Sequence, residues 1–232
     1  MKETIYSFKR YEKKYLLSRE SYERLMARLA PRLVPDDYHR STVRSIYYDW
    51  DDYRLIRHSI DAPLYKEKLR LRSYERPSAG SEVFVELKKK FKGVVYKRRV
   101  ASTEEAAVRW IAGETPPPQD SQMAREIDWF LHQNHPKPKV LIACDRTAWV
   151  AAEDPALRVT FDEAIRWREH DLLLSHGSAG ELLLPEGEVL MELKLPEAAP
   201  LWLAHLLCEE QLFPTGFSKY GVCYKEHLHH LL

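Results

Sequence analysis

The most chemically informative stretch of the sequence is residues 66–100, in which basic and apolar side chains alternate. Because alternate side chains of a strand point to opposite faces, we expect Lys68, Arg70 and Arg72 to share one face of a strand. Two further strands are expected to repeat the pattern, and their polar faces carry Glu86, Lys88, Lys90, Lys97 and Arg99. Three neighbouring strands would then present cations around one carboxylate. In an open sheet such a face would be ordinary solvated surface.

Strands that combine a glutamate with a lysine recur near both ends of the chain. Glu12 and Lys14 alternate with tyrosines, and Glu192 and Lys194 alternate with apolar residues. Two apolar segments between them each carry one arginine, and these are Arg146 and Arg158. Many charges that point into one concave space repel one another, so such an arrangement persists only if a strongly anionic ligand or a metal occupies that space.

The elements that position these residues are roughly eight strands joined by helices. Outside residues 66–100, strands are expected at about 7–17, 43–48, 140–150, 157–167 and 188–195, with short strands between 172 and 184. Helices are expected after an N-cap at Ser18, in an insertion at about 102–135, and at 200–212 and 218–232. Short connections and alternating polarity predict an α+β fold with a closed antiparallel β-barrel, in which charged faces line a central tunnel.

Two polar clusters lie at predicted helix starts. Ser102 followed by Glu105 has the spacing of a capping box and opens the helical insertion. Asp49, Asp51 and Asp52 follow a predicted strand. Paired aspartates can bind metals, but beside a turn they more often cap the following helix, and we adopt that interpretation.

Length and composition narrow the classes of function. A chain of 232 residues suits one large β-rich domain, and we expect a single domain over residues 1–232. The 36 basic and 35 acidic residues leave a net charge of +1, which argues against a general nucleic-acid or anionic-membrane binder. Three widely spaced cysteines suit a reducing compartment, and no apolar run approaches the roughly 20 residues that span a bilayer. These features predict a soluble, cytoplasmic protein.

Nine short segments, taken in chain order, match the sequence pattern of one known family. They are RYEKKYLL (10–17), RSIYYD (44–49), KLRLRSY (68–74), VFVELKKK (83–90), VYKRR (95–99), CDRTAW (144–149), LRVTFD (157–162), VLMELK (189–194) and FSKYG (217–221). In these segments the chain resembles the VTC (polyphosphate polymerase) domain family of the CYTH-like, or triphosphate tunnel metalloenzyme, superfamily. The resemblance implies the same barrel, with a tunnel that holds a polyphosphate chain or the triphosphate tail of a nucleotide.

The resemblance and the alternating charges together imply which side chains contact phosphate. Arginine binds phosphate oxygens as a planar fork and lysine as a mobile point charge, so a mixed lining holds several phosphates without recognising a base. Catalytic roles are expected for Lys14, Arg70, Arg72, Lys88, Arg146, Arg158 and Lys219. Substrate contacts are expected from Lys97, Arg99, Lys194 and Ser218. For the three cations of this second set, an ordinary salt-bridged or solvated side chain is the alternative.

Phosphoryl transfer also needs a divalent cation, Mn²⁺ or Mg²⁺, to neutralise developing charge, and hard oxygen ligands bind such a cation. Glu192 is the first choice as a ligand, because it lies where the family places its metal-binding glutamate. Glu86 and Glu12 are weaker candidates. In the wider superfamily the N-terminal strand reads Glu-x-Glu-x-Lys, and Arg10 replaces the first glutamate here. That replacement argues against a fully carboxylate-caged two-metal site and favours the polymerase branch over the thiamine-triphosphatase and adenylate-cyclase branches.

The sequence thus predicts a metal-dependent enzyme that moves the terminal phosphoryl group of ATP, or another nucleoside triphosphate, onto polyphosphate by positioning and charge stabilisation. Two alternatives remain open from the sequence. With water as acceptor the protein would be an inorganic or nucleoside triphosphatase or a short-chain polyphosphatase. Without the metal it would be a non-catalytic polyphosphate-binding module. Eukaryotic members of the resembling family are fused to membrane segments, so docking on a membrane partner is also open.

Overall fold

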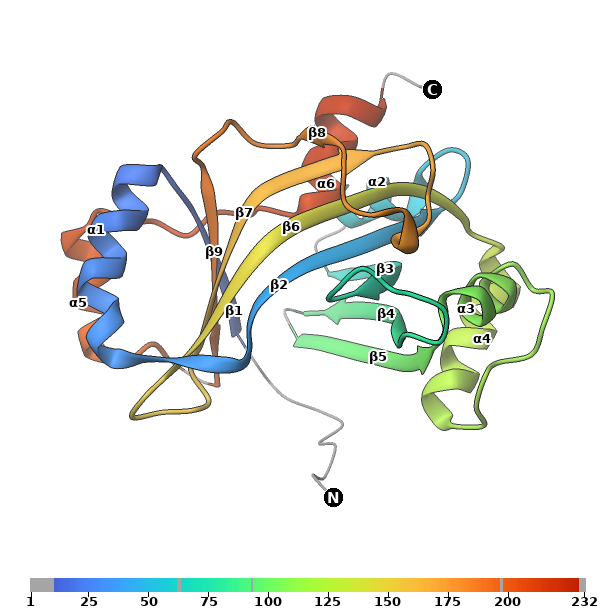
Figure 1. Cartoon of the computed structure of the whole chain (residues 1–232), viewed down its shortest axis with the longest axis horizontal. Coiled ribbons are helices and arrows are strands. Elements are labelled where there is room, and N and C mark those ends of the chain that lie inside the picture. Colours follow the sequence, from blue (N-terminus) through green and yellow to red (C-terminus); the bar gives the residue numbers. More distant parts are fainter. Residues whose placement is uncertain (1–10, 62–63, 93, 197, 230–232) are drawn as a thin grey trace. The chain divides into compact units, whose positions relative to one another are not determined.

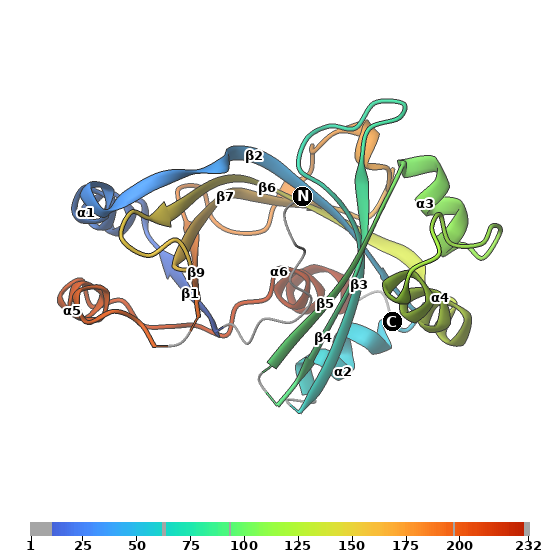
Figure 2. The same ribbon diagram turned by 90° about the horizontal axis from the view of Figure 1, so that it is seen from below.

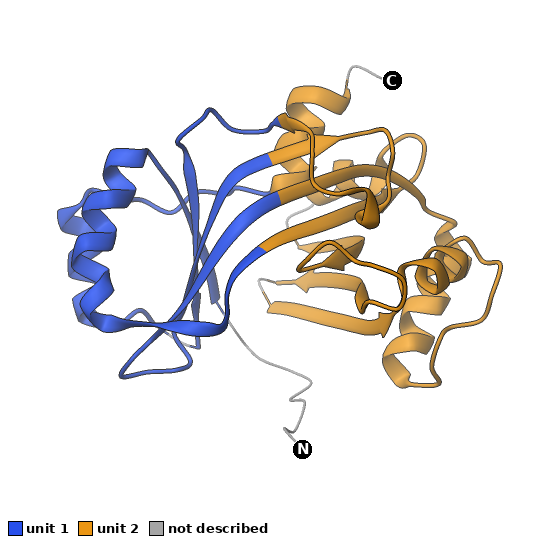
Figure 3. Cartoon of the chain, viewed as in Figure 1, with its two compact units in different colours: residues 1–41, 144–165, 182–218 blue, residues 42–143, 166–181, 219–232 orange. Residues whose placement is uncertain are grey.

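The computed structural model describes residues 11–61, 64–92, 94–196 and 198–229, and the chain divides into two compact units (Figures 1 and 3). Unit 1 comprises residues 1–41, 144–165 and 182–218, and unit 2 comprises residues 42–143, 166–181 and 219–232. Four strands contribute residues to both units: β2 (Leu33–Asp49), β6 (Lys137–Ala151), β7 (Arg158–Arg168) and β8 (Glu181–Leu182). The single domain expected over residues 1–232 stays a prediction.

Unit 1 combines antiparallel strands with two main helices. Its other elements are β1 (Tyr11–Leu17), α1 (Arg19–Leu29), η1 (Ala30–Arg32), β9 (Val189–Leu195) and α5 (Leu201–Glu209). Strand β9 pairs with β1 and with β7, and both pairings are antiparallel. Helix α1 begins after Ser18, whose side chain accepts a hydrogen bond from the Ser21 backbone N–H, as the sequence predicted.

The core of unit 1 lies between its strands and its helices. Leu17 and Phe161 of the strands pack with Leu25 of α1 and Leu207 of α5, and all four are buried. Arg28 of α1 also forms ion pairs with Glu209 and Glu210 at the C-terminal end of α5, and these ion pairs join the two helices. The apolar face of these strands is therefore covered, and their polar side chains occupy the other face.

Unit 2 carries the three basic strands predicted within residues 66–100. Its elements are α2 (Arg54–Asp61), β3 (Tyr65–Ser73), β4 (Val83–Phe91), β5 (Val94–Ser102), α3 (Glu104–Ile111), α4 (Gln122–Asn134), η2 (Leu174–His176), α6 (Lys219–Cys223) and η3 (Tyr224–Leu228). Strands β2, β3, β4 and β5 pair consecutively and antiparallel. Helices α3 and α4 cover the apolar face of β3–β5, where Leu69 and Val85 pack with Trp110 and Phe130 (Figure 2).

The strands pair in the order β1-β9-β7-β6-β2-β3-β4-β5, with β8 (Glu181–Leu182) beside β7. The α+β class and the antiparallel pairing are confirmed. Within the described residues no pairing joins β1 to β5 at the two ends of this path, so hydrogen bonds do not establish the predicted closed barrel. None of the helices in the described part of the chain is long and apolar enough to cross a membrane.

Local structure differs from the sequence prediction in three places. Strand β2 begins at Leu33, ten residues before the predicted start at 43. The segment predicted as short strands at 172–184 forms the 3-10 turn η2 and only the two-residue strand β8. Thr103, instead of Ser102, caps α3, because its hydroxyl accepts the hydrogen bond from the Ala106 backbone N–H while Ser102 still belongs to β5.

Candidate functional site

Glu86 is the centre of a charged row across β3, β4 and β5 in unit 2. It lies directly opposite Arg70 on one neighbouring strand and Arg99 on the other. Its carboxylate is completely buried and accepts from Arg70 Nε at 2.8 Å and Arg99 Nε at 2.7 Å. Lys97 Nζ lies 2.6 Å from Oε1 of the same carboxylate. Both carboxylate oxygens of Glu86 are therefore occupied by cations of its own unit.

Four cations act on this one carboxylate. Burial would raise the pKa of Glu86, but the positive charges of Arg70, Arg72, Lys97 and Arg99 hold it well below its usual value. Glu86 is thus ionised at neutral pH and neutralises only part of the positive charge. The remaining excess, held by side chains that strands fix in place, favours a multiply charged anion on this face.

The excess of positive charge extends along the strands on both sides of Glu86. Arg72 is buried and donates from Nε to the Ser45 hydroxyl at 3.0 Å. Lys68, Lys88 and Lys97 stand opposite one another on the three strands. Like charges at opposed positions destabilise a sheet unless an anion is shared between them.

Two groups of this face, Tyr74 and Lys97, titrate near neutral pH. Burial would raise the pKa of Tyr74, but Arg72, Arg99 and Lys97 lower it to about 8. Burial lowers the pKa of Lys97 to about 8, although Glu86 opposes that shift. The Tyr74 hydroxyl is also hydrogen-bonded to Arg99. The charge of this face therefore falls as the pH rises through this range.

Glu192 is the corresponding centre in unit 1, on β9. It stands opposite Lys14 of β1 and Thr160 of β7. Its carboxylate is contacted more loosely than that of Glu86, with Lys14 Nζ at 3.8 Å and Lys194 Nζ at 3.1 Å. Lys14 Nζ also donates to the backbone carbonyl of Phe217 at 3.0 Å.

The two arginines of unit 1 that were predicted to contact phosphate are paired with carboxylates. Arg146 forms a two-bond fork with Asp162, from Nε at 2.6 Å and from Nη2 at 2.7 Å. Arg158 is half exposed and lies 3.4 Å from Asp36. Glu12 stands opposite Lys194. The cations of this face are matched by carboxylates in nearly equal number.

The side chains around Glu192 fit a divalent cation whose other ligands would come from a phosphate substrate. The Thr160 hydroxyl, opposite Glu192, is buried without a hydrogen-bond partner in the described structure. Carboxylate and hydroxyl oxygens are hard ligands, and Mg²⁺ commonly takes one or two carboxylates plus substrate phosphates. Within the described ranges no group of three His, Cys, Asp or Glu side chains gathers to form an all-protein cage. Glu86 fits a cation poorly because cationic side chains already occupy both its oxygens.

The structure divides the predicted site residues between the two units. Lys14, Arg146, Arg158, Glu12, Glu192, Lys194 and Ser218 belong to unit 1, and Arg70, Arg72, Glu86, Lys88, Lys97, Arg99 and Lys219 belong to unit 2. Sequence reasoning did not include Tyr47, Tyr74 and Thr160. Tyr47 and Thr160 lie opposite Arg70 and Glu192, so extending the alternation to uncharged polar side chains of the matching segments would have included both.

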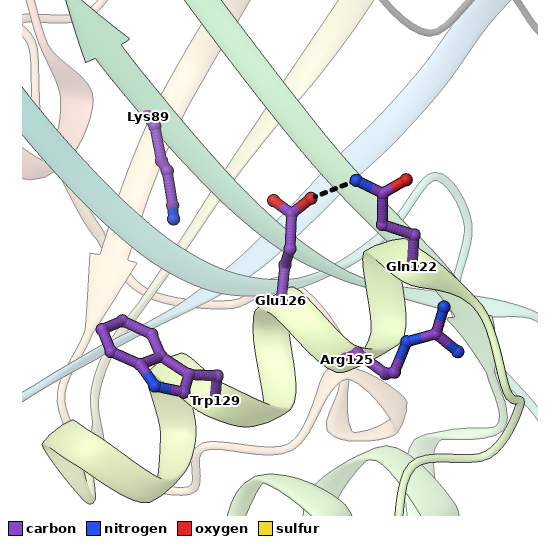
Figure 4. A pocket seen from close by; sticks show the side chains of 5 residues that line it. All are labelled: Lys89, Gln122, Arg125, Glu126 and Trp129. Atoms are coloured by element: carbon purple, nitrogen blue, oxygen red, sulfur yellow. Dashed lines mark hydrogen bonds between the residues drawn. The ribbon is translucent and has the colours of Figure 1, made fainter.

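A pocket of unit 2 lies apart from the charged rows. Lys89 of β4 and Gln122, Arg125, Glu126 and Trp129 of α4 line it, and Gln122 donates to Glu126 at 3.1 Å (Figure 4). Lys89 points to the helix-covered side of β4, opposite to Lys88. This pocket therefore contributes nothing to the face that carries Glu86.

Comparisons with known proteins agree with the strand pattern. A Bacillus halodurans protein described as a candidate adenylate cyclase has a TM-score of 0.58 and 14% identity, covering 92% of this chain and 96% of that chain. A Pyrococcus horikoshii protein has a TM-score of 0.50 and 12% identity, covering 94% and 99%. At such low identity these similarities show the fold alone, and no curated protein matches the sequence. The VTC domain model matches residues 9–227, and the chain therefore belongs to the VTC domain family, as its nine segments indicated.

Proposed function

We propose that this protein is a metal-dependent phosphotransferase that moves the terminal phosphoryl group of ATP, or another nucleoside triphosphate, onto a polyphosphate chain. Membership of the VTC domain family supports chemistry on triphosphates or polyphosphates. The observation that carries the proposal is the excess of positive charge around Glu86, where one buried carboxylate meets four cations. Such a surface suits a ligand with several closely spaced negative charges.

Unit 2 supplies the rigid part of the phosphate site. Glu86 holds Arg70 and Arg99 by short hydrogen bonds, so their guanidinium groups are positioned before a ligand arrives. Fixed donors need little reorganisation when charge develops on a transferring phosphoryl group. Arg72, Lys88 and Lys97 extend the row and would contact successive phosphates.

Unit 1 would hold the metal. Glu192 and Thr160 are the side chains we assign to Mn²⁺ or Mg²⁺, and the bound cation would neutralise charge on phosphate oxygens. Lys14 and Lys194 flank Glu192 and would orient phosphate oxygens beside it. Arg146, Arg158, Ser218 and Lys219 stay in the proposal as phosphate contacts. The closed barrel and its basic tunnel belong to the same proposal, because charged and apolar side chains alternate on the strands of each unit.

The experiment that tests the function is a product analysis. The purified protein is incubated with ATP and either Mn²⁺ or Mg²⁺, and polyphosphate is separated from orthophosphate on a gel. Long-chain polyphosphate is the expected product. Orthophosphate alone would replace the polymerase with the triphosphatase alternative. Neither product, together with binding of tripolyphosphate, would leave a non-catalytic binding module.

A further inference from the structure

A chain of buried contacts in unit 2 links Arg70 to the C-terminal segment. Arg70 Nη1 donates to the Tyr47 hydroxyl at 3.4 Å. The ring of Tyr47 stacks on that of Tyr220, with centroids 4.7 Å apart and planes 19° from parallel. The Tyr220 hydroxyl donates to Asp49 Oδ2 at 2.9 Å. Tyr47, Tyr220 and Asp49 are all buried, so none of these contacts is an incidental surface interaction.

Asp49 is itself held rigidly. Its carboxylate accepts from the backbone N–H groups of Trp50, Leu55 and Ile56 at 2.8, 2.9 and 3.0 Å. It therefore caps α2, as the sequence predicted, and offers a fixed anionic acceptor to Tyr220. A hydrogen bond to a buried charged acceptor is stronger than one between neutral groups.

The helix that carries Tyr220 needs such an anchor. Helix α6 (Lys219–Cys223) continues directly into η3 (Tyr224–Leu228), and an isolated helical segment as short as these two together is marginal in water. Lys219 directly precedes Tyr220, so the anchor of Tyr220 also fixes the backbone of Lys219. Tyr220 stacks on Tyr47, so the residue before it, Lys219, lies at the end of the helix nearest that contact. Burial would raise the pKa of Tyr47, but the positive charges of Arg70, Arg72 and Lys219 lower it.

Building on the proposed function, we propose that Asp49 and Tyr220 are positioning residues that hold Lys219 beside Arg70 and Tyr47 for phosphate binding. Neither residue would contact the substrate. Their effect would pass through the first turn of α6, so loss of the Tyr220 hydroxyl should loosen that turn and misplace the lysine.

The first test measures the anchor without any ligand. Tyr220→Phe removes only the hydroxyl and keeps the ring that stacks on Tyr47. Amide hydrogen exchange of residues 219–228 should become about tenfold faster, the factor expected when one hydrogen bond to a charged group is lost. Tyr224→Phe, in the same C-terminal segment, is the matched control and should leave the exchange unchanged. Unchanged exchange in Tyr220→Phe would overturn the inference.

The second test asks whether the anchor acts through Lys219. Tripolyphosphate binding is measured calorimetrically for the wild type, Tyr220→Phe, Lys219→Met and the double variant. We expect about a tenfold loss of affinity in Tyr220→Phe. The double variant should bind as Lys219→Met does, because two changes on one route are not additive. Independent, additive losses would overturn the inference.

The outcomes for the two proposals are distinct. If the wild type binds tripolyphosphate and Tyr220→Phe binds it equally well, the inference fails and the proposed function stands. If the wild type does not bind tripolyphosphate, the proposed function fails, and so does the role given to Lys219. If Tyr220→Phe folds poorly, Asp49→Asn is the second variant. It should also accelerate amide hydrogen exchange in residues 219–228.

Discussion

The same tripeptide, Glu-Leu-Lys, occurs in both units and has a different environment in each. In unit 2 it is Glu86-Leu87-Lys88, and the glutamate is buried between two arginines and a lysine. In unit 1 it is Glu192-Leu193-Lys194, and the glutamate has longer contacts with two lysines and stands opposite Thr160, whose hydroxyl has no partner among the described residues. The residues on neighbouring strands, and not the local sequence, therefore determine what each glutamate can do.

The two faces also differ in charge balance: the face around Glu86 has an excess of cations, and the face around Glu192 does not. Around Glu86 the cations outnumber the carboxylate, which favours phosphate. Around Glu192, Arg146 and Arg158 are paired with Asp162 and Asp36, so cations and carboxylates are more evenly balanced there. We therefore assign phosphate binding mainly to the first face and metal binding to the second.

The largest effect is expected from Glu192→Gln. The substitution keeps the size of the side chain but removes the charge that would bind the metal, so polyphosphate synthesis should fall by two or more orders of magnitude, roughly the loss typical of a removed catalytic electrostatic interaction. The melting temperature should fall less than in Glu86→Gln, because the carboxylate of Glu192 is partly exposed whereas that of Glu86 is completely buried. Glu12→Gln, on the neighbouring strand, is the control with a smaller expected loss. Full activity of Glu192→Gln at limiting Mn²⁺ would remove Glu192 from the metal site.

Glu86→Gln should act on stability instead. It leaves buried cations without their counter-charge, which costs about 3–5 kcal/mol. For a chain of this size the melting temperature should fall by roughly 10 °C. Because the folded pKa of Glu86 lies below its unfolded value, its contribution is present above the unfolded pKa and is lost as the pH falls through the folded pKa. Thermal melts at neutral and acidic pH measure both effects, and a stable Glu86→Gln protein would contradict this assignment.

Substituting one arginine on each face compares the phosphate affinities of the two faces. A ligand that binds only the folded state adds RT ln(1 + [L]/Kd), or about 2.7 kcal/mol at a hundredfold excess over Kd. Tripolyphosphate should thus raise the melting temperature by several degrees, and orthophosphate at equal ionic strength should raise it less. Arg72→Ala should remove most of this shift, and Arg158→Ala, at a half-exposed and paired arginine, should remove less of it. Equal shifts in both variants would show that the faces do not differ.

The smallest effect concerns pH. Lys97 loses its charge and Tyr74 becomes anionic near pH 8, so tripolyphosphate affinity should fall severalfold between about pH 7 and 9. Both folded pKa values lie below the ordinary ones, so the unfolded chain binds more protons above about pH 8. The stability of the ligand-free protein should therefore gain from these groups as the pH rises. Tyr74→Phe should flatten the affinity profile, and a profile identical to that of the wild type would exclude Tyr74.

The sequence predicted the strands of the charged faces because their period of two places charged and apolar residues on opposite sides. It also predicted the helical insertion and the capping role of Asp49. It did not show that the Glu86 carboxylate accepts hydrogen bonds from Arg70 and Arg99, because the register between the strands determines those contacts. Tyr47, Tyr74 and Thr160 are not among the residue types that are ordinarily charged, so a search for alternating charges gave no signal for them.

The central claim is that Glu192, and not Glu86, serves the metal. The most direct measurement is the Mn²⁺ concentration that gives half-maximal polyphosphate synthesis, compared between the wild type and Glu192→Asp. The shorter side chain should raise that concentration about tenfold or more, the scale seen when metal ligation is disturbed, with the melting temperature nearly unchanged. An unchanged Mn²⁺ requirement in Glu192→Asp would contradict the claim.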